Sequence, residues 1–381
     1  MDRLQSSSLA FRNDWKLPLL YFWFLALLCL WAPPRSLAQE KGWEKRWSDI
    51  LAAARKEGKL VLAAAPDPLL REALPQKFTA RYGIQVEYLG GRSSEMSSRL
   101  RAERQAERYT LDVVTSGIQT MAAILYREKM LDPLKPTLIL PEVTDPTKWK
   151  KGKLWFMDPE EMHILRLFNN VSATFYINTN YVKPEELTSI KSLLHPKWRS
   201  KISFFDPTVP GTGSNTAAQL YVQVGEAFVK ALYLEQKPVI SRDKRQLEEW
   251  LVHGSYPISF GTRSEEIERL QKEGFPIASA PYLPDAPESV GAASGLIALV
   301  NKAPHPNAAR VFVNWLASRE GAETFSRAQL HATTRNDVDE SFLPAHVIPK
   351  PGVQYFDSYD WEFTVTAKEK IRLWLRDLLR K

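Results

Sequence analysis

Three short stretches of the sequence contain residues that could bind an anion. Residues 211–215 (GTGSN) follow a predicted strand and open a predicted helix, and residues 90–94 (GGRSS) have the same setting. Backbone N–H groups at the start of a helix, assisted by the helix dipole, bind carboxylate or phosphate groups. Arg263, just after another predicted strand, adds a guanidinium that can bind such a group through two hydrogen bonds. The residues expected to bind the ligand are Gly91, Arg92, Ser93, Ser116, Gly211, Thr212, Gly213, Ser214, Asn215 and Arg263.

The same residues also have a purely structural interpretation. The glycines can serve tight turns, Ser93 and Ser214 are ordinary residues for the start of a helix, and the two arginines can be solvated. The sequence alone leaves both interpretations open.

The pattern of apolar residues indicates alternating strands and helices. The predicted strands are 59–64, 84–89, 111–115, 173–178, 202–205, 258–260 and 296–300. The predicted helices are 43–57, 69–82, 93–108, 120–129, 189–194, 214–232 and 244–251. This order is typical of mostly parallel sheets with helices on both faces, in which ligands lie at the carboxyl ends of the strands. With 381 residues, two α/β lobes are expected rather than one oversized sheet.

Catalysis is not predicted. The glycine-rich loop at 211–213 lacks the lysine of a phosphate-binding P-loop, and no nucleophile-elbow sequence is present. The acidic residues Glu160 and Glu161 with His163 are too loosely spaced for a metal site. The sequence therefore predicts a binding protein with no catalytic residue, cofactor or bound metal.

Charge and targeting signals limit the partners and the location. The formal net charge is +7, with basic residues spread among acidic ones, so no nucleic-acid partner is expected. The apolar run 17–31, followed by Ser36, Leu37 and Ala38, is typical of a cleavable signal peptide over residues 1–38. An uncleaved anchor is the alternative. The only cysteine, Cys29, lies in this run, so the mature periplasmic chain would have no disulfide.

Several motifs resemble a known family when taken in order. They are residues 194–202 (LHPKWRSKI), residues 304–312 (PHPNAARVF) followed by 315–321, and residues 78–86 followed by 111–113. Together they resemble the extracellular solute-binding proteins of ABC importers, in the branch that includes the ferric-ion-binding proteins. The resemblance covers most of the chain from about residue 58 onward.

The resemblance implies an α/β fold of the type II periplasmic binding protein kind. Two lobes would enclose a solute in a cleft, joined by hinge strands at 173–178 and 291–300, and the loaded monomer would dock on an inner-membrane ABC permease. The first lobe is expected at 39–172, completed by about 291–318. The second is expected at 173–290, completed by 319–381.

The ligand of this chain need not be the ferric ion that gives that branch its name. Ferric-binding relatives hold iron with two tyrosines, a histidine and a glutamate. The corresponding positions here are Ser264 and Glu265 for the tyrosines, Pro66 for the histidine and Gly117 for the glutamate. None of those donors is present, and a trivalent cation needs several anionic oxygens. A small anionic solute is therefore expected instead. A ferric carrier with non-standard donors, or a periplasmic sensor or adaptor, is the alternative.

Overall fold

The computed structural model describes residues 35–380, without the side chains of residues 35–41, 93 and 94. Residues 1–34 of the expected signal peptide, Cys29 and the side chain of Ser93 therefore lie outside the described residues. The chain divides into two compact units, Met1–Arg46 and Trp47–Lys381. Helix α2 (Arg35–Glu57) begins in the first unit, and all other elements belong to the second. Within residues 35–380, no helix combines the length and apolar character needed to cross a membrane.

The first lobe is built on a mixed sheet with strand order β2-β1-β3-β13-β4, in which β5 also pairs with β13. Its parallel strands are β1 (Lys59–Ala64), β2 (Gln85–Gly90) and β3 (Val113–Ser116). Strand β13 (Leu296–Val300) pairs antiparallel with β3, with β4 (Leu131–Asp132) and with β5 (Leu165–Arg166). The residues of β13 are all apolar and buried, as expected for a strand in the middle of a covered sheet.

Helices of the first lobe bury apolar residues in one core with this sheet. They are α3 (Pro68–Tyr82), α4 (Ser93–Gln105), α5 (Ile118–Thr120), α6 (Pro141–Thr144), α11 (Pro306–Ala317) and α12 (Arg319–Gln329). Phe312 and Trp315 of α11 contact Phe78 of α3, with ring centroids 5.0 and 5.4 Å apart. Such aromatic contacts inside a closely packed core stabilise the lobe on which the expected ligand residues lie.

The second lobe has its own sheet, with strand order β11-β7-β10-β8-β9. Strands β8 (Ile202–Phe205), β9 (Val239–Ser241) and β10 (Ile258–Phe260) are parallel to one another. Strand β7 (Tyr176–Asn178) pairs antiparallel with β10 and with β11 (Ile277–Ser279). Its helices are α7 (Thr212–Val224), α8 (Glu226–Lys230), α9 (Lys244–His253), α10 (Ser264–Lys272) and α13 (Lys368–Leu379). The predicted continuous helix 214–232 is interrupted at Gly225, whose φ of 103° does not fit a helix.

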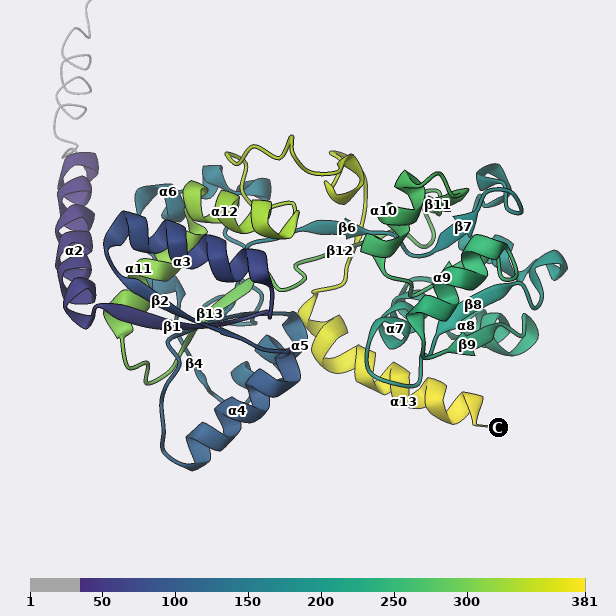
Figure 1. Cartoon of the computed structure of the whole chain (residues 1–381), viewed down its shortest axis with the longest axis horizontal. Helices are drawn as coiled ribbons and strands as arrows, with labels where there is room; N and C mark the ends of the chain where they lie inside the picture. Colours follow the sequence, from purple (N-terminus) through teal and green to yellow (C-terminus); the bar gives the residue numbers. More distant parts are fainter. Residues whose placement is uncertain (1–34, 381) are drawn as a thin grey trace, which may run out of the picture. The chain divides into compact units, whose positions relative to one another are not determined.

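A small third sheet connects the two lobes, and its strands β6 (Asn170–Ser172) and β12 (Ser289–Gly291) lie between them (Figure 1). The third strand is β14 (Phe356–Asp357), and the strand order is β14-β12-β6. The expected hinge strands at 173–178 and 291–300 are therefore misplaced, because β7 belongs to the second sheet and β13 to the first. The apolar residues of β7 and β13 form part of the sheets inside the two lobes, whereas the crossings between the lobes use the short, more polar strands β6, β12 and β14.

The C-terminal segment is divided between the lobes. The expectation that residues 319–381 complete the second lobe is wrong for α12, which packs beside α3 in the first lobe (Figure 1). Phe325 of α12 is fully buried in the first core. Helix α13 packs on α7 of the second lobe, where Leu375 is fully buried. Between these helices, β14 crosses the hinge a third time.

Short helical turns fill the connections. The 3₁₀ turns are Lys135–Thr137, Pro146–Lys148, Lys150–Gly152, Pro184–Glu186, Ile190–Leu194, Pro196–Trp198 and Ala345–Val347. The π-helical segments are Met121–Tyr126, Ala231–Glu235 and Glu362–Ala367.

Candidate ligand-binding cleft

The loop before α7 is fixed by a buried carboxylate. Asp206 follows β8 and accepts hydrogen bonds from the backbone N–H of Thr208 at 2.8 Å, from its hydroxyl at 2.6 Å, and from Arg242 Nε at 2.7 Å. Burial alone would raise the pKa of Asp206, but the hydrogen bonds from Thr208 and Arg242 outweigh burial and lower the pKa. The ionised carboxylate therefore holds the loop in place.

Two glycines in this loop are required by the backbone. Gly211 has a φ of 141°, which side chains rarely allow. At Gly213, a Cβ would lie 2.2 Å from the carbonyl oxygen of Phe205. Ser214 is buried, and its hydroxyl accepts the N–H of Gly211 at 3.1 Å and donates to the Gly211 carbonyl at 3.0 Å. For Gly211, Gly213 and Ser214, the structural interpretation therefore explains the residue type.

The start of α7 opens on a pocket of about 340 Å³ that is lined by both lobes and the hinge. We call it the interlobe pocket. Thr212 and Asn215, both expected ligand residues, line it from the second lobe. The other lining residues are Gly117, Ile118, Gln119, Ser172, Ala173, Thr174, Thr216, Gln219, Ser289, Ser358, Tyr359, Phe363 and Lys368. Hydroxyl and amide groups predominate, so the pocket suits a polar ligand.

Lys368, at the start of α13, is the charged residue of this pocket. The described residues that line the pocket include no carboxylate and no other charged side chain. Burial lowers the pKa of Lys368, and only the weaker influence of Glu369 opposes this. No ion pair or hydrogen bond to its ammonium group comes from residues 35–380. A half-buried cation in these surroundings favours a negatively charged ligand.

Lys244 adds a second cation next to the start of α7. Its ammonium donates to the Thr212 hydroxyl at 3.1 Å and lies 5.5 Å from the ring centre of Phe205. Burial lowers its pKa as well. Because Thr212 lines the interlobe pocket, Lys244 contributes positive potential there without lining the pocket itself.

A second pocket of about 260 Å³ lies in the first lobe. We call it the first-lobe pocket. Its lining includes the expected residues Gly91, Arg92 and Ser116, together with Ala64, Ala65, Pro66, Met96, Thr115 and Ser294. These residues come from the carboxyl ends of the parallel strands β1, β2 and β3 and from the start of α4, where a ligand was expected.

Arg263 does not reach either pocket. Its Nε donates to Glu248 Oε1 at 3.0 Å, its Nη2 also contacts Glu248, and its backbone N–H donates to the same carboxylate at 3.0 Å. This pairing holds the pKa of Arg263 above its ordinary value. Arg263 therefore lies against α9, and the geometry does not bear out its expected place in the cleft.

Tyr359 was missed by the sequence analysis. Its hydroxyl donates to the Ala293 carbonyl at 2.7 Å, and burial raises its pKa to about 12. A Cβ at Gly117 would lie 3.2 Å from the same carbonyl and 3.8 Å from the Tyr359 hydroxyl. Tyr359 reaches the cleft from the third hinge crossing, and no local sequence pattern marks it.

The donor set does not fit a ferric ion. The described residues contain no cluster of three or more His, Cys, Asp or Glu side chains that could hold a metal. The one phenol of the interlobe pocket, Tyr359, is engaged with a backbone carbonyl and has a raised pKa, which opposes ionisation. The acidic residue beside His163 has a structural role instead: the carboxylate of Asp158 accepts hydrogen bonds from the backbone N–H groups of Met162 and His163.

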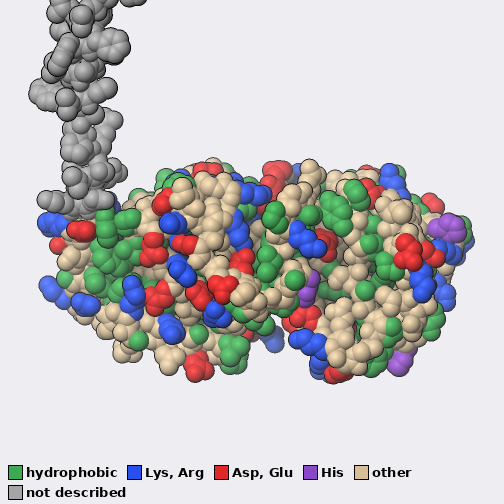
Figure 2. All heavy atoms as spheres, turned by 90° about the horizontal axis from the view of Figure 1, so that it is seen from above, with side chains coloured by type: hydrophobic (Ala, Val, Ile, Leu, Met, Phe, Trp, Pro, Cys, Tyr) green, Lys and Arg blue, Asp and Glu red, His purple; other side chains and the backbone are tan. Residues whose placement is uncertain are grey.

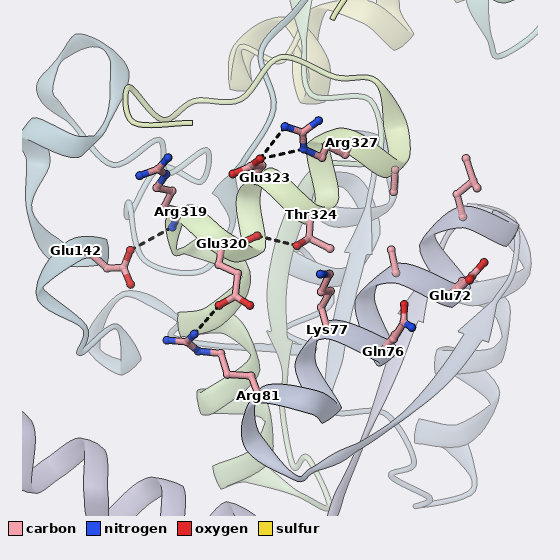
Figure 3. Close-up of a pocket in the computed structure, with 13 residues that line it drawn as sticks. Glu72, Gln76, Lys77, Arg81, Glu142, Arg319, Glu320, Glu323, Thr324 and Arg327 are labelled. Atoms are coloured by element: carbon pink, nitrogen blue, oxygen red, sulfur yellow. Dashed lines mark hydrogen bonds and ion pairs between the residues drawn. The ribbon is translucent and has the colours of Figure 1, made fainter. Parts of the chain in front are cut away.

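A larger hollow lies elsewhere, in a groove of about 770 Å³ between α3 and α12 of the first lobe. Figure 3 shows two arginines of this groove paired with glutamates: Arg81 contacts Glu320 at 2.9 Å, and Arg327 contacts Glu323 at 2.9 Å. On the face shown in Figure 2, acidic and basic side chains are likewise interspersed. The groove belongs to one lobe and its charges are balanced, so it does not have the features of the solute site.

Comparisons with known proteins agree with this architecture. The sequence profile described as bacterial extracellular solute-binding protein matches residues 63–323. The structure resembles iron-bound HitA from Pseudomonas aeruginosa, with a TM-score of 0.59 and 16% identity over 84% of this chain and 99% of that one. No curated protein matches the sequence significantly.

Two further solved structures share the fold. Trichodesmium IdiA (FutA), in complex with iron and citrate, gives a TM-score of 0.65 at 18% identity over 85% of this chain and 100% of that one. AfuA from Actinobacillus pleuropneumoniae, with bound fructose-6-phosphate, gives a TM-score of 0.55 at 17% identity over 85% of this chain and 99% of that one. These likenesses concern the fold alone.

The chain is thus a two-lobed periplasmic binding protein by fold and a binding protein rather than an enzyme by class. It belongs to the bacterial extracellular solute-binding protein family, whose members bind a small solute and deliver it to an ABC permease. The family membership also implies a periplasmic location.

Proposed function

We propose that this chain captures a small anionic solute in the interlobe pocket and delivers it to its permease. It acts as a monomer, after cleavage of the signal peptide over residues 1–38. The observation that carries this proposal is Lys368. Its ammonium group is half-buried in a pocket whose described lining has no carboxylate, and burial lowers its pKa. A negatively charged group beside it would restore the interaction that the ammonium loses with water.

The rest of the pocket supports a ligand with hydrogen-bonding groups. The start of α7, a helix of 13 residues, provides Thr212 and Asn215, and Lys244 lies behind Thr212. Thr174 also lines the pocket, and its hydroxyl has no hydrogen-bond partner among the described residues. A carboxylate or phosphate attached to a hydroxylated body would match these groups. Fructose-6-phosphate, bound to AfuA, is a compound of this class.

Iron transport is the competing proposal, because HitA and the Trichodesmium protein are described with iron. The lining of the interlobe pocket argues against it. A ferric ion requires several anionic oxygens, whereas this pocket has a cation, no carboxylate among its described residues, and a phenol whose pKa is raised.

Thermal unfolding of the purified chain tests the proposal. Carboxylates, sugar phosphates, inorganic phosphate, neutral sugars, polyamines and ferric citrate are added separately at up to millimolar concentration. An anion present at about 100 times its Kd should stabilise the fold by about 2.7 kcal/mol. Stabilisation only by cations, neutral sugars or the ferric salt would contradict the proposal.

Substitution of Lys368 assigns the effect to the interlobe pocket. Lys368→Met keeps the aliphatic stem and removes the charge, so the stabilising anion should bind about tenfold or more weakly, since about 1.4 kcal/mol corresponds to tenfold. Lys370→Met, two residues along the same helix at an exposed position, is the matched control and should bind normally. Equal affinities of the two variants would remove Lys368 from the site.

A further inference from the structure

We propose that the first-lobe pocket is a second anion subsite, so that the transported solute carries two acidic groups. This inference rests on the proposed function, because it assigns one acidic group to Lys368 in the interlobe pocket. The other acidic group would lie beside Arg92, at the start of α4. The ligand class is therefore a small solute with two acidic groups, such as a dicarboxylate or a phosphorylated carboxylic acid.

The position of the first-lobe pocket favours ligand binding. Ala64 ends β1, Gly91 directly follows β2, and Ser116 ends β3, and these three strands run parallel. The pocket therefore lies at the carboxyl edge of the sheet, where side chains and backbone groups not used in strand pairing converge. Its volume of about 260 Å³ is enough for a carboxylate or phosphate group with part of its carbon skeleton.

The charge of this pocket is positive. Arg92 is the one charged residue among its described lining residues, and the guanidinium of an arginine can bind carboxylate or phosphate through two parallel hydrogen bonds. Glu95 lies nearby, but its Oε2 accepts the Arg92 backbone N–H at 3.0 Å and thereby caps the start of α4. The backbone N–H of Arg92 is thus already used. The attraction for a ligand comes from the Arg92 side chain.

An unpaired hydroxyl supports the assignment. Thr115 lines the first-lobe pocket with only 2% of its surface exposed, and its Oγ1 has no hydrogen-bond partner among the described residues. A buried hydroxyl without a partner is costly, and an acidic group in this pocket would supply one. Ser294 adds a further hydroxyl side chain to the lining.

The two pockets are neighbours along the chain and in space. Residues 115–116 line the first-lobe pocket and residues 117–119 line the interlobe pocket. Their common boundary includes Gly117 and the hydrogen bond from the Tyr359 hydroxyl to the Ala293 carbonyl, next to Ser294. A ligand with an acidic group in each pocket would pass Tyr359. Arg92 and Lys368 would then hold opposite ends of the same solute.

The test uses two pairs of probe compounds, and the members of each pair differ by one acidic group. They are malate with 3-hydroxybutyrate, and 3-phosphoglycerate with glycerol 3-phosphate. Calorimetry on the full mature chain gives each Kd for the wild type, Arg92→Gln, Lys368→Met and the control Arg99→Gln, which changes an exposed arginine further along α4. In at least one pair, the two-acid compound should bind the wild type about tenfold or more tightly than its one-acid partner.

The variants then separate the two subsites. Arg92→Gln should abolish the preference for the two-acid compound and leave the one-acid compound unchanged, whereas Lys368→Met should weaken both and Arg99→Gln neither. Equal affinities within both pairs, or a preference that survives Arg92→Gln, would overturn the second subsite while leaving the proposed function intact. If no acid in either pair binds at millimolar concentration, the second subsite and the small-anion assignment are both overturned.

Discussion

Arg166 and Asp357 join the first lobe to the third hinge crossing. Arg166 Nη1 donates to both carboxylate oxygens of Asp357, at 2.8 and 2.9 Å, although Arg166 is fully buried and Asp357 is partly exposed. The other guanidinium nitrogens donate to the Phe168 carbonyl and to Asn169. Since Tyr359 follows Asp357 by two residues and donates its N–H to the same carboxylate at 3.0 Å, this pair positions the segment that leads to Lys368.

Replacement of Arg166 should therefore destabilise the fold. Arg166→Met leaves the Phe168 carbonyl and Asn169 without their donor and Asp357 without its counter-ion, so we expect a loss of about 3 kcal/mol in the free energy of unfolding. Urea denaturation measures it. Arg376→Met, which removes the exposed pair with Asp377, is the control and should change stability by less than about 1 kcal/mol. Equal losses in both variants would contradict this role for Arg166.

Gly213 should tolerate no side chain. In Gly213→Ala, the new Cβ would approach the carbonyl oxygens of Phe205 and Asp206 to 2.2 and 2.5 Å, so the start of α7 must shift. We expect a loss of about 1 to 3 kcal/mol in stability, as for other overpacked sites. Gly42→Ala is the comparison, because nothing lies within 4 Å of a Cβ there and alanine favours helices. Unchanged stability of Gly213→Ala in urea denaturation would show that the loop adapts.

Arg263→Ala should separate stability from binding. Glu248 is almost fully buried and would lose its only described ion-pair partner, so the variant should unfold at a lower temperature. Its affinity for the anion should stay within about twofold of the wild type, because Arg263 lines neither pocket. A tenfold weaker affinity, measured by calorimetry, would place Arg263 in the ligand site after all.

Anion affinity should depend on pH through Lys368. In the free protein, burial lowers the pKa of Lys368 below its ordinary value of 10.5. A bound anion favours the charged ammonium and therefore raises the pKa in the complex. Binding then takes up a proton. Affinity should be greatest below the pKa of the free protein, fall by up to about tenfold per pH unit as the pH rises through it, and level off above the pKa of the complex.

A dicarboxylate probe isolates this effect, because its own groups are fully ionised over the alkaline range. Calorimetric titrations from neutral to alkaline pH should give a flatter profile for Lys368→Met than for the wild type, with any remaining slope assigned to Lys244. Superimposable profiles would rule out Lys368 as the titrating group.

Local patterns predicted the cores well. Ile202–Phe205, Ile258–Phe260 and Leu296–Val300 were predicted with the bounds that the structure has, since a short apolar run between turn residues is typical of a buried strand. The hinge strands Asn170–Ser172 and Ser289–Gly291 were misplaced. Their pairing depends on backbone hydrogen bonds between distant segments, and three residues are too few for a periodic pattern.

The lining of the candidate site was only partly predictable for the same reason. Thr212 and Asn215, predicted from a glycine-rich turn at the start of a helix, line the interlobe pocket. Lys368 carries no such signal, since it is one of several lysines in an amphipathic tail and reaches the pocket only through the fold. Arg263 pairs with Glu248 and lines neither pocket; the sequence does not indicate this contact, because the two residues are 15 positions apart and meet only through the packing of α9 and α10.

The most direct test of the central claim is a crystal structure of the mature chain with the anion that stabilises it most. We expect an acidic group of the ligand at hydrogen-bond distance from Lys368 Nζ, next to Thr212 and Asn215 at the start of α7. A ligand bound outside the interlobe pocket, for instance in the groove between α3 and α12, or a ferric ion held in the cleft by protein oxygens, would contradict it.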